Sequence, residues 1–136
     1  MTDLSDVEFL ARFADCSLPA SAFDHLGHLR MAWLHLQRQP LAEAVEAICG
    51  GIERFATHLN VPQKYNRTLS EALVVLMAAG GATDRTVDWV EWQARNAELV
   101  GDARGVLARH YSDERLTSPD ARTRFVVPDR APLPLR

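Results

Sequence analysis

The sequence has little cysteine and no long hydrophobic run. Its 136 residues include two cysteines, which are too few for a disulfide framework and read as buried thiols. The apolar stretches fall short of the ~18–20 residues that a membrane-spanning helix needs, and the first segment is acidic where a secretory signal would be basic. We therefore expect a cytoplasmic protein with no membrane partner.

Positive charge is also in short supply. The 15 Lys and Arg residues against 18 Asp and Glu residues give a formal net charge of -3, and the basic residues are scattered along the chain. Such a chain has no general electrostatic attraction for phosphate backbones, so we expect no nucleic-acid partner. Glycine-rich phosphate loops and the motifs GxSxG and HExxH are missing too, which argues against nucleotide hydrolysis and standard esterase chemistry.

Alternating runs of β-branched residues between two-residue turns are absent as well. Instead, glycine and proline divide the chain into segments of helical length. The 47% hydrophobic content and the chain length fit one hydrophobic core. The sequence therefore predicts an all-α fold, a single compact bundle of five to six helices, folding alone or as a homodimer. The helical domain would span residues 1–126, and the proline-rich residues 127–136 would form an extended tail.

Apolar residues at helical spacing give the expected positions of the helices. These are about residues 4–14, 21–39, 41–59, 68–79, 87–99 and 106–110, followed by a turn over residues 118–125. Gly50 and Gly51 lie inside the third helix, where each costs about 1 kcal/mol relative to alanine. A close helix crossing or a kink would explain why two glycines are found there.

Three histidines lie along one edge of the second expected helix. At about 100° per residue, His25, His28 and His35 fall within a narrow arc beside the apolar stripe, and the small Gly27 leaves room for close approach of backbone or ligand. Two neutral imidazoles at this spacing can converge on one ion, so His25 and His28 are candidate ligands of a divalent transition metal or candidate acid/base groups. A metal would need a third ligand from another helix. The alternative is a pair of structural histidines bonded to backbone carbonyls.

A second polar cluster lies in residues 58–71, which lead into the buried fourth helix. If this loop folds over the histidine edge, the Lys64 ammonium and the Tyr65 hydroxyl would hold an anionic ligand. Otherwise Lys64 is solvated and Tyr65 plugs the loop against the core. We take Lys64 and Tyr65, with His25 and His28, as the candidate catalytic residues.

The start of the fourth helix has two interpretations. In the first, Thr68 and Glu71 form a capping box. We favour this interpretation because the pattern is local and is sufficient to explain both residues. If the cap lies earlier, at Asn66, Glu71 points into the core, where a carboxylate needs a cation or a proton partner. Together with Arg30 of the second helix, Asn66, Thr68 and Glu71 are candidates for substrate binding.

Four motifs in this chain resemble those of an uncharacterised family of small bacterial all-helical proteins. They are CSLP at residues 16–19, FxHxxHxRxA at 23–32, KYNRTLS at 64–70 and HYSxERLxSPxARxxFVxPD at 110–129. The resemblance implies a shared helical fold and brings no assigned activity. The family's third motif resembles KYHETLT, whereas this chain has Asn66 in place of the histidine, and an amide is a poor ligand for zinc-like metals. If that position belongs to an ion site of the family, the site is altered here.

Two functions from different classes follow from these residues. The first is a small cytoplasmic enzyme, metal-assisted or not, that acts on a small polar or anionic molecule in a pocket lined by His25 and His28. The second is a non-catalytic domain that binds a small ligand or a protein. In that case the histidines are structural or form a recognition surface, and Trp89 with Trp92 buries a partner.

Overall fold

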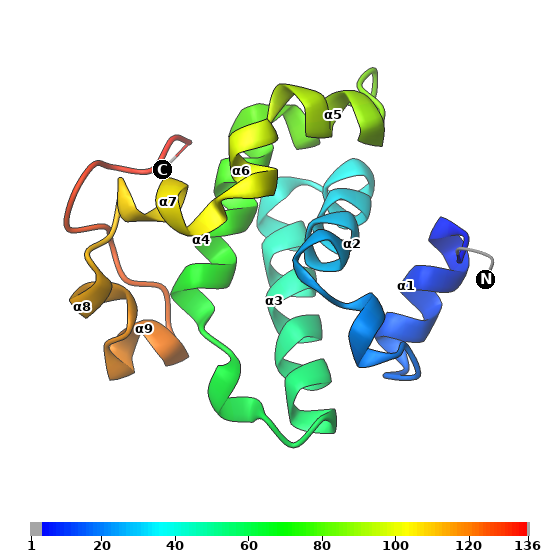
Figure 1. Cartoon of the computed structure of the whole chain (residues 1–136), viewed down its shortest axis with the longest axis horizontal. Helices are drawn as coiled ribbons and strands as arrows, with labels where there is room; N and C mark the ends of the chain where they lie inside the picture. The colour runs from blue at the N-terminus through cyan, green and yellow to red at the C-terminus, as the bar shows by residue number, and fades with distance from the viewer. Residues whose placement is uncertain (1–3, 136) are drawn as a thin grey trace.

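The computed structural model describes residues 4–135, and every regular element in that range is helical (Figure 1). The all-α prediction is therefore confirmed. The longer helices are α1 (Asp6–Ala14), α2 (His25–Arg38), α3 (Leu41–His58) and α4 (Arg67–Met77). The shorter helices are α5 (Trp89–Arg95), α6 (Ala97–Gly101), α7 (Ala103–Ala108), α8 (Asp113–Leu116) and α9 (Pro119–Thr123). Single helical turns are η1 (Ala20–Ala22), η2 (Pro62–Lys64) and the π-helical η3 (Ala78–Ala82).

The carboxyl-terminal half contains more and shorter helices than the sequence pattern predicted. In place of one helix over 87–99, α5 and α6 are separated at Asn96, whose side-chain amide donates to the carbonyls of Gly80 at 3.0 Å and Trp92 at 2.8 Å. The turn expected over 118–125 contains α9, because Ser118 caps it and proline fits the first helical position. Residues 4–135 thus contain nine α-helices where five or six were expected.

Helices α2, α3 and α4 form the centre of the fold. α3 packs against both α2 and α4, and α1 packs across α2 and α3. In Figure 1, α1 lies on one side of this centre and α7 to α9 lie on the other. Among the described residues, no helix combines the length and the hydrophobicity that a bilayer crossing requires. The largest fully buried aliphatic side chains of the main core come from the three central helices: Leu29, Met31, Leu36, Ile48, Val74 and Met77.

The segment after α9 returns to α4 and closes a second, smaller hydrophobic cluster. Residues 124–135 contain no helix or strand, but Val126 and Leu133 are buried against side chains of α4 and α7. The Tyr111 hydroxyl, itself buried, donates to the Val126 carbonyl at 2.7 Å. Of these two residues, Leu133 lies in the segment 127–136 that was expected to form a proline-rich tail, so this segment is anchored to the smaller cluster by a buried apolar side chain.

Gly50 and Gly51 are neighbours in the middle of α3 but have different surroundings. A Cβ at Gly51 would lie 2.6 Å from the ring of Phe13, so α1 approaches α3 closely at this point. A Cβ at Gly50 would meet no atom within 4 Å, and this residue is exposed. The close crossing expected from the glycine pair is therefore made by Gly51.

We expect Gly51→Ala to lower the free energy of unfolding by about 1–2 kcal/mol, because overpacking outweighs the gain in helix propensity. The Phe13 ring has little freedom to retreat, since it packs against Phe23 and Phe55 with ring centroids 4.9 and 5.7 Å away. Gly50→Ala is the matched control and should raise the free energy of unfolding by about 0.5–1 kcal/mol. Urea denaturation of both variants measures the difference, and equal effects would contradict the crossing.

Candidate functional site

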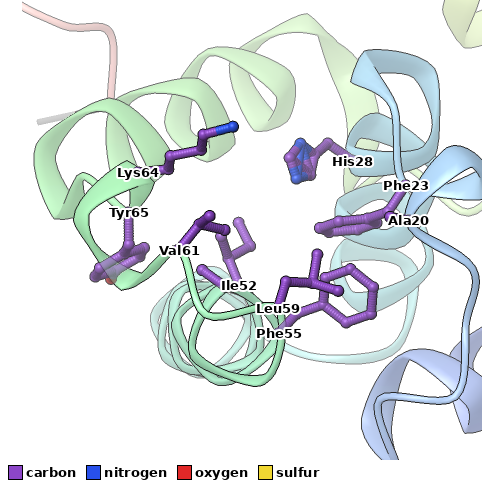
Figure 2. Close-up of a pocket in the computed structure, with 10 residues that line it drawn as sticks. Ala20, Phe23, His28, Ile52, Phe55, Leu59, Val61, Lys64 and Tyr65 are labelled. Carbon is purple, nitrogen blue, oxygen red and sulfur yellow. The ribbon is translucent and has the colours of Figure 1, made fainter.

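A largely apolar pocket of about 220 Å³ opens between η1, the first turn of α2, the second half of α3 and η2 (Figure 2). Its two nitrogen-bearing side chains are His28 and Lys64, and Figure 2 shows the Lys64 side chain extending toward the His28 ring. An adjoining cavity of about 120 Å³ shares His28, Lys64 and Tyr65 with this pocket and continues between α3 and α4. The apolar part of the pocket surface comes mainly from Ala20, Phe23, Ile52, Phe55, Leu59 and Val61.

The start of α2 fixes the position of His28. The Asp24 carboxylate caps the helix and accepts a hydrogen bond from the Gly27 N–H at 2.8 Å. Gly27 has no room for a side chain, because a Cβ there would lie 2.3 Å from the carbonyl oxygen of Ala22. The close approach expected at Gly27 is thus made by backbone. One residue later, the His28 ring packs edge-on against Phe23 with ring centroids 3.8 Å apart.

The two nitrogen-bearing side chains of the site differ in charge: the His28 ring is neutral, and the Lys64 ammonium group is positive. Burial, with a smaller contribution from the nearby His25, lowers the pKa of His28 to about 4, although the Asp24 carboxylate opposes the shift. At neutral pH the His28 ring is therefore uncharged and offers one donor and one acceptor nitrogen. Lys64 lies at the exposed end of η2 and supplies the positive charge. The pocket can thus bury an apolar group beside one cationic and one neutral hydrogen-bonding group.

His25 and His35 lie outside this pocket. His25 is exposed, and its Nε2 lies 3.4 Å from the carbonyl oxygen of Leu99 in α6, which matches the structural alternative for this residue. His35 pairs through Nδ1 with the Gln39 side chain at 3.2 Å. Within residues 4–135, no three or more His, Cys, Asp or Glu side chains are grouped to hold a metal ion. No third ligand of these types is therefore grouped with His25 and His28 in the described part of the chain, and a metal ion at these two histidines stays a prediction.

Arg30, a candidate for substrate binding, instead joins α2 to α1. Its guanidinium donates to the Leu4 carbonyl at 2.8 Å and to the Asp6 carboxylate at 2.9 Å. The same group lies over the Phe9 ring, 4.4 Å from its centroid. These contacts hold the first helix in place and leave Arg30 outside the residues that line the pocket.

Asn66, and not Thr68, caps α4. The Asn66 side-chain oxygen accepts a hydrogen bond from the Leu69 N–H at 2.9 Å, so the favoured capping box is wrong and the alternative is confirmed. Thr68 is buried, donates to the Arg124 carbonyl at 2.8 Å and accepts from the Val126 N–H at 3.1 Å. The role of Thr68 is therefore to tie the carboxyl-terminal segment to α4. The capping-box interpretation was wrong because the sequence does not reveal that the carboxyl-terminal segment returns to Thr68.

Glu71 is buried, and its carboxylate is paired within the same helix. The Arg67 guanidinium donates to it through Nε at 3.0 Å and reaches the exposed Glu46 of α3 at 2.5 Å. These two carboxylates raise the pKa of Arg67, and Arg67 lowers the pKa of Glu46. The alternative with the cap at Asn66 required a cation beside the buried Glu71, and Arg67 is that cation. We therefore assign a structural role to the Glu71 side chain.

Tyr65 contributes its ring to the pocket, while its hydroxyl interacts with the Cys49 thiol in α3. In Figure 2 the ring projects away from His28. Burial raises the pKa of Cys49 to about 11 and raises that of Tyr65 as well. Neither group ionises near neutral pH, so the pair behaves as the loop plug that was the alternative to a catalytic tyrosine. Cys49 also fits the expected buried thiol, and both cysteines are free.

Of the predicted site residues, the structure brings His28, Lys64 and the Tyr65 ring to one pocket and lets Asn66 line its inner extension. His25 and Arg30 lie outside this pocket, and Thr68 and Glu71 make structural contacts inside the fold.

Comparison of the chain with protein-family models, with curated proteins and with solved structures found no match.

Proposed function

We propose that this protein binds a small amphipathic anion, such as a carboxylic acid with an aromatic or short aliphatic body, in the pocket beside His28. The observation that supports this is an apolar wall with an ammonium group and a neutral imidazole at one end. Burial of apolar surface contributes about 25 cal/mol per Å². A charge-assisted hydrogen bond from Lys64 would fix the anionic end of the ligand.

The size of the pocket supports a ligand of one ring or a few carbons. An apolar cavity of about 150 Å³ already accepts benzene. This pocket, at about 220 Å³ with an adjoining 120 Å³, has more space than that and is open to solvent on one side. Sites with few polar groups select by shape and by the position of those groups.

Binding without turnover is the function that the geometry favours over the enzyme predicted from sequence. Among residues 4–135, the polar side chains that line the pocket are those of His28, Lys64 and Tyr65, and the Tyr65 hydroxyl is engaged with Cys49. His25 lies outside the pocket. A His28 pKa of about 4 makes the ring a weak base and leaves it without the imidazolium proton that a general acid would transfer at neutral pH. Catalysis by these residues stays a prediction.

We expect phenylacetate to bind the wild-type protein saturably and Lys64→Met to weaken this binding about five- to tenfold, the loss of one exposed charge-assisted contact. Lys64 is the only lysine in the sequence, beside 14 arginines, so selectively labelled lysine gives one signal at the mouth of the pocket. That signal and the His28 ring resonances should move during titration followed by NMR.

Two comparisons make this test specific. Lys64→Arg keeps the charge and should retain most of the affinity, and His25→Gln lies outside the pocket and should change nothing. Phenylacetamide, which lacks the charge, should bind wild type and Lys64→Met equally. Absence of saturable phenylacetate binding, or shifts that bypass His28 and Lys64, would refute the proposed site.

A further inference from the structure

A polar groove of about 340 Å³ lies on the other side of Lys64, between η2, the start of α4 and the helices α7 to α9. It shares Lys64, Tyr65, Asn66 and Leu69 with the inner cavity that extends the apolar pocket. The two hollows are therefore neighbours, with the single lysine at the boundary between them.

The groove is lined by an excess of positive charge. Arg104 of α7, Arg122 of α9 and Lys64 contribute three cations, and Asp113 at the start of α8 contributes one anion. In a chain whose formal net charge is -3, this is a local reversal of sign. Guanidinium groups form planar, bidentate hydrogen bonds with phosphate oxygens, so two arginines in one groove fit a phosphate dianion better than a single carboxylate.

The lining of the groove is held in place by hydrogen bonds that leave donors for a ligand. Arg122 donates to the carbonyl of Gln63 through one nitrogen, and a guanidinium has five N–H donors in all. The Asn66 amide donates to the Leu116 carbonyl at 2.7 Å and so joins the start of α4 to α8. Segments distant in the sequence are thus fixed around one cationic hollow.

We infer that this groove binds a phosphate group and that the ligand of this protein is a phosphomonoester with an apolar body, the body lying in the pocket beside His28 and the phosphate reaching past Lys64 to Arg104 and Arg122. This inference rests on the proposed function, since it extends the same site. It adds the chemical class of the anionic end and two residues that recognise it.

The test compares hexyl phosphate with hexanoate by isothermal titration calorimetry at fixed ionic strength. Wild type should bind hexyl phosphate about tenfold more tightly than hexanoate, which corresponds to two exposed charge contacts of ordinary strength. Arg104→Gln/Arg122→Gln should remove that advantage and change hexanoate affinity less than about twofold. The control Arg38→Gln/Arg85→Gln removes the same charge from exposed positions outside the groove and should preserve the advantage.

Asp113→Asn is expected to change hexyl phosphate affinity in the opposite direction. Loss of folding cannot produce such an increase in affinity. Removing the one carboxylate in the groove should tighten hexyl phosphate binding about two- to threefold and leave hexanoate unaffected. Equal affinity of wild type for both probes, or equal loss of hexyl phosphate binding in the groove and control variants, overturns the phosphate assignment alone. Failure of both probes to bind wild type overturns the proposed function with it.

Discussion

Between pH 7 and pH 4, protonation of His28 is expected to lower the free energy of unfolding of the wild-type protein by up to about 3 kcal/mol. The His28→Gln variant has no imidazole at this position and should not show this contribution. In the folded state the pKa of His28 is about 4, whereas its ordinary value is 6.5. Between these values the unfolded chain binds the proton and the folded chain does not, so stability falls as the pH falls. Each pKa unit is worth about 1.4 kcal/mol, which sets the upper limit.

Urea denaturation at intervals of half a pH unit measures this effect as the difference between the wild-type and His28→Gln curves. The two curves should diverge below pH 6.5 and run parallel below pH 4, because the folded ring is then protonated too. His58→Gln serves as the control, since this side chain is exposed and is not among the groups that shift the pKa of His28, so the variant should follow wild type. Curves that stay parallel throughout would show that His28 is not shielded from water.

Arg67→Met is expected to lower the free energy of unfolding by about 3 kcal/mol, because it removes the guanidinium that lies 2.9 Å from the buried Glu71 carboxylate. Removing one partner of a buried pair commonly costs about 3–5 kcal/mol. The Arg67 side chain is 22% exposed, which places the effect at the lower end of that range. Circular dichroism during urea denaturation gives the value.

The double variant Arg67→Met/Glu71→Leu should recover most of the loss, because it removes the buried carboxylate as well as the guanidinium and replaces the pair with apolar groups of similar size. Glu46→Gln is the matched control: this carboxylate is 70% exposed, so its loss should cost less than about 1 kcal/mol. A double variant as unstable as the sum of its single changes would contradict the assignment of Glu71 to structure.

Local signals in the sequence were sufficient for the fold class and for most helix positions in the first half of the chain. Pro40 ends α2 near the predicted residue, and the apolar stripe of α3 matches its observed bounds. In the second half, α5 and α6 separate at Asn96 because its amide bonds the distant carbonyl of Gly80. Periodicity does not report a contact of that kind.

The site was less accessible to sequence reasoning, as the two histidines show. His25 and His28 fall in the same arc of one helix, yet one meets the Leu99 carbonyl and the other meets the Phe23 ring. Their surroundings come from segments that the helical spacing does not specify. The pocket wall was missed for the related reason that Phe55 belongs to an apolar stripe, and such a stripe looks the same whether it faces a packed core or a cavity.

The buried hydroxyl of Thr68 fastens the carboxyl-terminal segment to the start of α4, beside the site where we propose that a ligand binds. It bonds the backbone at Arg124 and Val126 through two hydrogen bonds, and it lies in the first turn of α4, which follows the loop that carries Lys64. Proteolytic cleavage just after Arg124 would release Val126 from its hydrogen bond with Thr68 and let the first turn of α4 fray. Loss of the twelve residues 125–136 would then loosen this side of the pocket while the contacts between α2 and α3 remain intact.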